Sequence, residues 1–294
     1  MKRREFLKLV GIAGATAVAG PERSQASTTD VNDTYGVLQD LTRCNGCRTC
    51  ELACAETNGL PLPEDEDEEI LDATVRPTSE TQWSVVNCFK TSAGDVYVKK
   101  QCMHCNTPAC TSACLTKALF KTEEGAVIWR EDKCMGCRFC MVSCPFDIPK
   151  FEYNSANPRI QKCRMCWERQ REAKLPACVE QCPKQALSFG KRSGLLEIAR
   201  ERIYQNPGEY VSHIYGEREA GGTAWMYISP VPFEELGFRT DLDETAYPEY
   251  SRNFLTAVPI VLIMWPAFLL ALRQATAPAP DETLQSDPTQ TKGV

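Results

Sequence analysis

The chain has 294 residues, of which 43% are apolar, so it can bury a core in one or two domains. Seventeen cysteines are far more than ordinary usage, yet the chain is too long for a small scaffold in which disulfides replace a missing core. The formal net charge is -6 and the only strongly basic stretch beyond the N-terminus is 159–174, which argues against nucleic acid as a partner. The composition therefore favours a protein built around a cofactor.

The N-terminus resembles a twin-arginine export signal. Arg3 and Arg4 precede a short apolar stretch of small residues, and a Ser-Gln-Ala sequence ending at Ala26 fits a cleavage site, so we expect residues 1–26 to be a signal peptide. Lys2 stands where such signals usually have Ser or Thr. An ordinary first helix behind a basic N-terminus is the alternative. The signal predicts that the bulk of the protein lies on the periplasmic side of the cytoplasmic membrane.

Residues 254–272, near the C-terminus, are uncharged, apolar and about as long as a helix that crosses a bilayer. Pro259 and Pro266 would break a soluble helix, but membrane helices tolerate proline where neighbouring helices satisfy the freed carbonyls. A buried hairpin is the alternative, but the polar tail at 273–294 gives it no later core to join. We therefore expect one transmembrane helix that anchors the protein, with a partner helix beside it.

Sixteen of the seventeen cysteines fall into four runs, which form an internal repeat. Runs one and three have the C-x2-C-x2-C-x3-C spacing of bacterial ferredoxins. Zinc sites use separated C-x2-C pairs, so triple runs suit one tetrahedral ion poorly. Regular quartets with one cysteine left over also make an odd disulfide framework. The spacing therefore predicts iron-sulfur clusters, with a zinc-bearing structural protein as an alternative from another class.

The pairing of the runs sets the predicted ligands. Residues 115–133, between runs two and three, indicate two short strands around a turn at 123–125, so runs two and three form one ferredoxin-like unit. Runs one and four then close a second unit around it. In a two-cluster ferredoxin the fourth cysteine of a run binds the other cluster of the pair. The four predicted ligand sets are Cys44, Cys47, Cys50 and Cys182; Cys54, Cys163, Cys166 and Cys178; Cys102, Cys105, Cys110 and Cys144; and Cys114, Cys134, Cys137 and Cys140.

On these motifs the chain resembles the four-cluster electron-transfer subunits of membrane-bound respiratory oxidoreductases, over roughly residues 35–272. That family includes the beta subunits of formate dehydrogenase-N and dimethyl sulfoxide reductase. The resemblance implies an α+β fold, with two interleaved dicluster units in 35–192, a helical or extended extension in 193–250 and four 4Fe-4S clusters. It also implies a non-catalytic subunit that carries electrons between a catalytic subunit and an integral-membrane, quinone-reactive subunit. Leu115 departs from the family, which usually has proline there.

Two features favour a nickel-iron uptake hydrogenase as the catalytic partner. The chain carries an export signal of its own, and residues 215–238, with their Gly-Gly-Thr and Val-Pro-Phe-Glu elements, resemble the segment before the membrane helix of the hydrogenase-2 type of subunit. A formate dehydrogenase or another molybdopterin enzyme is the alternative partner. A stand-alone iron-sulfur enzyme is disfavoured, because the sequence has no evident nucleophile-base pair, phosphate loop or nucleotide fingerprint.

Several residues near the runs need an interpretation of their own. Cys88 lies outside every run on an apolar, strand-like segment and is expected to be a buried structural thiol. His104 is expected to pack against the site rather than to bind metal. Residues 193–205 indicate a helix that caps the core with Leu195, Leu196, Ile198, Ala199 and Ile203. Six basic residues around run four either tune a cluster or form a solvated face: Arg159, Lys162, Arg164, Arg169, Arg171 and Lys174.

Overall fold

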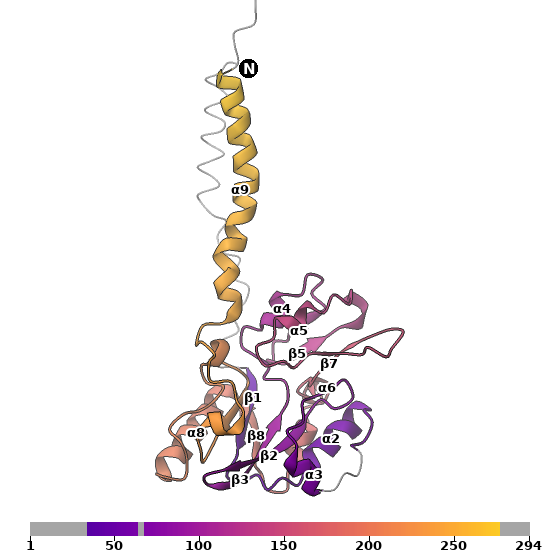
Figure 1. Ribbon diagram of the computed structural model, residues 1–294, viewed down its shortest axis with the longest axis vertical. Helices are drawn as coiled ribbons and strands as arrows, with labels where there is room; N and C mark the ends of the chain where they lie inside the picture. The colour runs from indigo at the N-terminus through magenta and orange to yellow at the C-terminus, as the bar shows by residue number, and fades with distance from the viewer. Residues whose placement is uncertain (1–33, 64–67, 277–294) are drawn as a thin grey trace, which may run out of the picture. The chain divides into compact units, whose positions relative to one another are not determined.

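The computed structural model describes residues 34–63 and 68–276 (Figure 1). The expected signal peptide at 1–26 lies outside the described residues, as does most of the expected polar tail. The described chain divides into two compact units, one ending at Pro248 and the other beginning at Glu249. Each is described by itself.

The first unit mixes short helices with short strands, as expected for a ferredoxin-like α+β fold. Its strands are β1 (Tyr35–Asp40), β2 (Val85–Thr91), β3 (Gly94–Lys100), β4 (Leu119–Lys121), β5 (Val127–Trp129), β6 (Lys150–Phe151), β7 (Ile160–Gln161), β8 (Leu187–Lys191) and β9 (Trp225–Ile228). Its helices are α2 (Thr49–Asn58), α3 (Glu68–Ala73), α4 (Ala109–Ser112), α5 (Phe139–Val142), α6 (Trp167–Arg171), α7 (Ala177–Glu180) and α8 (Arg192–Gln205). Short 3-10 turns are η2 (Glu131–Lys133), η3 (Glu219–Gly221) and η4 (Phe233–Leu236).

A three-stranded sheet joins the two ends of the cysteine-rich region. β1, which precedes run one, pairs antiparallel with β8, which follows run four, and parallel with β9. Five of the six residues of β1 are buried, because partners cover the strand on both faces. The sheet therefore brings the chain just before run one next to the chain just after run four.

Three antiparallel hairpins complete the strands of this unit. β2 pairs with β3, from Val85 opposite Lys100 to Thr91 opposite Gly94. β4 pairs with β5 around Gly125, whose φ of +107° suits glycine, and this confirms the two short strands predicted between runs two and three. β6 pairs with β7 ahead of run four. Every run of cysteines is therefore preceded by a strand or a strand pair that fixes its start.

The short helices carry the later cysteines of each run and pack in two pairs. α2 of run one contacts α7 of run four, and α4 of run two contacts α5 of run three. In Figure 1, α4 and α5 lie together near β5, apart from α2 and α3. The fold thus groups the outer two runs with each other and the inner two runs with each other.

α8 covers the sheet, with one departure from the predicted apolar face. The helix begins at Arg192, one residue earlier than expected, and packs Leu195, Leu196 and Ala199 against β1 and β8. Ile203 contacts the same cluster, but Ile198 is exposed, so its inclusion in the predicted face was wrong. Ile198 lies about 60° from Leu195 on the side away from Leu196 and Ala199, at the edge of the helix that the sheet does not reach.

The C-terminal helix α9 (Tyr247–Thr276) contains the predicted span at 254–272 and continues past it at both ends. In the described part of the chain it is the one helix long and apolar enough to cross a membrane. Pro259 and Pro266 both lie inside the helix.

Candidate iron-sulfur site

All seventeen cysteines lie in the described residues, and none of them is in a disulfide. Two cavities are each lined by one complete predicted ligand set. The first contains Cys44, Cys47, Cys50 and Cys182. The second contains Cys114, Cys134, Cys137 and Cys140. The first and last of the predicted sets therefore each surround a space of their own.

The members of the other two sets are also neighbours. The pKa of Cys105 is raised by burial and then by the nearby thiols of Cys102, Cys144 and Cys110. In the remaining set burial again raises the pKa values first. The Cys54 thiol then raises those of Cys163 and Cys166, and these two thiols raise that of Cys178. We name the sets, in this order, the first quartet (Cys44, Cys47, Cys50, Cys182), second quartet (Cys54, Cys163, Cys166, Cys178), third quartet (Cys102, Cys105, Cys110, Cys144) and fourth quartet (Cys114, Cys134, Cys137, Cys140).

Each run begins with the same backbone turn. The residue before its second cysteine has a positive φ: Gly46 at 74°, His104 at 46°, Gly136 at 71° and Met165 at 54°. Glycine adopts this conformation readily, whereas histidine and methionine adopt it at a cost in strain of about 1–3 kcal/mol. The turn folds the loop back on itself so that neighbouring cysteines of a run face a common space. In runs two and four the turn is therefore strained, because His104 and Met165 take the place of glycine.

Burial makes the thiolate form of several of these cysteines unfavourable in the protein alone. It raises the pKa of Cys50, Cys110, Cys140 and Cys163 to about 12. A coordinating metal deprotonates a thiol outright and supplies the missing positive charge. Between residues 34 and 276, leaving out 64–67, no three His, Cys, Asp or Glu side chains converge as one metal ion requires. Four thiols around a shared space are instead a donor set that fits an iron-sulfur cluster.

The quartets follow one another in a fixed order. In three cases burial raises the pKa of a cysteine and a thiol of the neighbouring quartet raises it further. Cys50 does so for Cys178, Cys102 for Cys163, and Cys140 for Cys110. The first quartet therefore neighbours the second, the second neighbours the third, and the third neighbours the fourth. Of the seventeen cysteines, all within the described residues, Cys47 and Cys137 are the exposed ones. They belong to the first and the last quartet.

The basic residues around run four divide into one buried lysine and five that make other contacts. Lys162 is 3% exposed, and its ammonium group donates to the carbonyl oxygens of Val127 and Cys163, the latter at 3.0 Å. The others pair at or near the surface: Arg159 with Glu131, Arg164 with Glu168, Arg169 with Glu180 and Lys174 with Glu172, while Arg171 lies over the Trp167 ring. These five therefore lie on a partly solvated face, but the charge of Arg169 also counteracts the burial that raises the pKa of Cys166, a cysteine of the second quartet.

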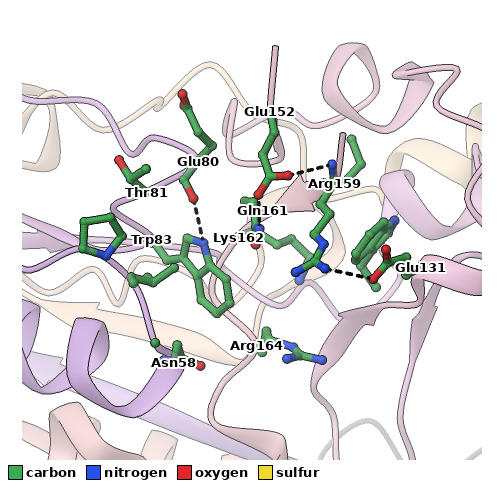
Figure 2. A pocket seen from close by; sticks show the side chains of 15 residues that line it. Asn58, Glu80, Thr81, Trp83, Glu131, Glu152, Arg159, Gln161, Lys162 and Arg164 are labelled. Atoms are coloured by element: carbon green, nitrogen blue, oxygen red, sulfur yellow. Dashed lines mark hydrogen bonds and ion pairs between the residues drawn. The ribbon is translucent and has the colours of Figure 1, made fainter. Parts of the chain in front are cut away.

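Figure 2 shows how Arg159 is held in a polar cavity of about 420 Å³. Its guanidinium group lies 3.4 Å from a Glu131 carboxylate oxygen, and its backbone N–H donates to Glu152 at 3.1 Å. Trp83 donates to the Glu80 carbonyl on the opposite wall. No cysteine lines this cavity, but Lys162 and Arg164, which flank Cys163, and Asn58, which donates to the Cys54 carbonyl, are part of its wall.

His104 packs beside the third quartet and is not placed as a metal ligand through Nδ1. It is fully buried, and its Nδ1 accepts a hydrogen bond of 2.8 Å from the Val127 backbone N–H. Burial, and then the charges of Lys162 and Lys121, hold its pKa well below the usual range, so the ring is neutral and carries its proton on Nε2. Among the described residues, Nε2 has no hydrogen-bond partner.

Cys88 lies on β2, is 4% exposed and belongs to no quartet, which confirms the prediction of a buried thiol outside the site. Burial, followed by the Asp72 charge, raises its pKa.

The Gly-Gly-Thr element has a structural role that the sequence did not reveal. The Gly222 carbonyl accepts from the Asn106 N–H at 2.9 Å, and the Ala224 N–H donates to the Met103 carbonyl at 3.2 Å. A bridge between Cys105 and Thr223 lies between these two bonds. The element therefore holds the start of run two. Two adjacent glycines were the signal of this close backbone approach.

Three comparisons with known proteins bear on this site. A 4Fe-4S dicluster domain matches residues 95–192, which contain runs two, three and four. A protein of Nitratidesulfovibrio vulgaris is 50% identical over 279 residues, covering 92% of this chain and 75% of the relative. The Hydrogenase-2 operon protein HybA of Escherichia coli O157:H7 is 33% identical over 290 residues, covering 86% of this chain and 88% of the relative. The chain belongs to the family of HybA-like iron-sulfur subunits.

The similarity extends to a second kind of subunit over a shorter part of the chain. The iron-sulfur subunit of the nitrate-inducible formate dehydrogenase of Escherichia coli K12 is 32% identical over 200 residues, covering 65% of this chain and 66% of the relative. The HybA-like resemblance thus covers more of the chain than the formate dehydrogenase resemblance does.

Proposed function

We propose that this HybA-like chain is a non-catalytic subunit in which four 4Fe-4S clusters form an electron-transfer wire. The observation that carries the proposal is the order of the quartets: four sets of four thiols follow one another, and the exposed cysteines Cys47 and Cys137 belong to the terminal sets. When bound, each cluster supplies a one-electron redox centre. The protein holds the clusters in sequence and keeps water from the inner two.

The proposed ligand sets are the four quartets, arranged as two interleaved dicluster units. Contacts between α2 and α7 and between α4 and α5 support this pairing of the runs, as does the pairing of β1 with β8. In each proposed unit the fourth cysteine of one run joins the three close cysteines of its partner run, as in two-cluster ferredoxins.

The two ends of the wire are the proposed sites of electron entry and exit. Around Cys137 the surface is unusually apolar, because four large side chains there are more than half exposed: Leu115, Met135, Phe139 and Val142. Such a patch suits burial against another protein. We assign this end to a redox partner subunit, and the end at Cys47 to the second partner of the complex.

The proposed location is the periplasmic side of the cytoplasmic membrane. Export follows from the twin-arginine motif, which carries folded, cluster-loaded proteins, and anchoring follows from α9. The apolar part of α9 lies between Arg252 and Arg273. Its two prolines support a neighbouring membrane helix, which a quinone-reactive subunit would supply.

The proposed catalytic partner is a nickel-iron uptake hydrogenase. The extent of the similarity to HybA favours it over a molybdopterin enzyme of the formate dehydrogenase type, the second candidate. To decide, the complex is purified anaerobically from detergent-solubilised membranes through a tag on this chain, and its metals are measured. Nickel with abundant iron supports the hydrogenase, whereas molybdenum or tungsten identifies the second candidate.

A further inference from the structure

Lys99 places a positive charge inside the protein, beside the first quartet. It lies on β3, is 2% exposed and lines the same cavity as Cys44, Cys47, Cys50 and Cys182. Its ammonium nitrogen lies 5.5 Å from the centre of the Trp225 ring, which is itself buried. The charge is therefore held at a fixed place in the core.

No carboxylate in the described part of the chain pairs with this ammonium group. Glu51, on α2, is the buried acid that follows Cys50, but it pairs with Arg76 at 2.8 Å and accepts from Gln82 at 3.2 Å. Asp40, at the end of β1, pairs with Arg202 at 2.9 Å. A buried charge without a partner is strongly unfavourable, so Lys99 needs negative charge from another source.

The groups that act most strongly on Lys99 are cysteines of two quartets. Burial lowers the pKa of Lys99, but Cys50 of the first quartet and Cys178 of the second raise it, so that the net shift is upward. The packing agrees: Trp225, over which Lys99 lies, belongs to the same buried cluster as Cys178 of the second quartet, and Cys50 and Cys182 of the first quartet pack against that cluster. One lysine therefore serves two neighbouring quartets.

The third quartet has basic neighbours of its own. Lys121 donates to the Cys105 carbonyl at 2.8 Å, and Lys162 acts on Cys110 and Cys144. Their ammonium groups also satisfy backbone carbonyls, whereas that of Lys99 makes no hydrogen bond among the described residues. Of these three lysines, Lys99 is therefore the one that, within the described chain, contributes its charge without a hydrogen bond.

We propose that Lys99 is the shared counter-charge of the first two clusters and raises their reduction potentials. This inference rests on the proposed function. Each cluster gains a negative charge when it is reduced, so a fixed positive charge beside it stabilises the reduced form. Lys99 does not bind a cluster itself. Its charge keeps the first two clusters reducible in a buried, low-dielectric site.

The test is a redox titration, followed by electron paramagnetic resonance, of the complex carrying Lys99→Met. At a fixed potential the reduced-to-oxidised ratio of two of the four clusters falls about tenfold, which is a shift of about 59 mV to more negative potential for a one-electron couple. The third and fourth clusters keep their potentials. Lys99→Arg, which retains the charge, stays near wild type. Lys90→Met is the matched control, because Lys90 lies on the paired strand but is exposed and bound to Asp95.

Loss of the first two clusters in Lys99→Met but not in Lys99→Arg also supports the proposal, since the charge is then needed to hold them. Four clusters with unchanged potentials in Lys99→Met would overturn it, as would equal loss of clusters in both variants. If the wild-type protein lacks four clusters, the proposed function itself fails, and the iron content of the wild type separates that case from the others.

Discussion

Cys140 and Cys88 are both buried thiols on short elements, yet their surroundings differ in kind. The strongest electrostatic neighbours of Cys140 are the three other thiols of the fourth quartet. Cys88 instead faces carboxylates, Asp72 and Asp95. Cys140 is surrounded by the thiols proposed to share one cluster, whereas no thiol is among the strongest electrostatic neighbours of Cys88. Burial alone therefore does not identify a ligand.

This difference makes a prediction for the two matched substitutions. Cys140→Ser removes one thiolate from the fourth quartet, so we expect the fourth cluster to be lost or altered while the other three remain, with total iron reduced by roughly a quarter. Cys88→Ser is expected to leave all four. Iron content and the spectrum of the reduced protein report both outcomes. Full iron and an unchanged spectrum in Cys140→Ser would refute the ligand assignment.

The spacing of the cysteines predicted four ligand sets, and two of them each line a cavity of their own. The spacing was not enough to predict the charges beside them. Lys99 and Lys121 lie outside the runs, on strands whose pairing turns their side chains toward the quartets, and neither has a motif. Among the basic residues that the sequence did single out, Lys162 alone is buried. Burial of a charge depends on tertiary packing, which local sequence does not encode.

The runs depend on neighbouring elements that contain no cysteine. The turn from Gly216 to Ala224 holds run two by backbone hydrogen bonds, and β9 then adds a parallel strand to β1. The hairpin of β4 and β5 was predictable, because its strands are adjacent in sequence. The pairing of β1 with β9 was not, since nearly two hundred residues separate the two strands and neither has a signal for its partner.

Gly222 provides the test of this supporting turn. It has a φ of +80°, and a methyl group there would lie 2.6 Å from the Asn106 side-chain nitrogen and 2.8 Å from the Glu217 carbonyl oxygen. We expect Gly222→Ala to destabilise the protein by at least about 1–3 kcal/mol from backbone strain alone. Thermal loss of the visible cluster absorption measures the change.

Gly194→Ala is the control for this substitution. Gly194 lies in α8 with open space around its Cβ position, so alanine there is expected to be neutral or to stabilise by up to about 1 kcal/mol. Equal thermal stability of the two variants would show that the turn at Gly222 does not support run two.

At the scale of the whole molecule, the proposed wire has two ends, and each is marked by one exposed cysteine, Cys47 or Cys137. The apolar surface around Cys137 is the clearest sign, because soluble surfaces seldom gather side chains as exposed as Leu115 at 82% and Val142 at 81%. Burial of that area against a partner removes it from water.

Val142→Glu tests this surface without touching a ligand. The substitution puts a charge into the proposed interface, so we expect one partner subunit to be lost from the purified complex while all four clusters remain. Tyr204→Glu is the control, since Tyr204 is 88% exposed on α8, which carries no quartet. If the Val142→Glu complex keeps every partner at wild-type stoichiometry, the apolar surface around Cys137 is not the binding site of a partner subunit.

The most direct test of the four-cluster wire is quantitative analysis of the full-length chain, purified anaerobically in its complex and compared with the same complex prepared without this subunit. The difference should be about sixteen iron and sixteen acid-labile sulfide per chain, with four one-electron reduction steps in a redox titration. Zinc in place of iron, or iron for two clusters alone, would contradict the account.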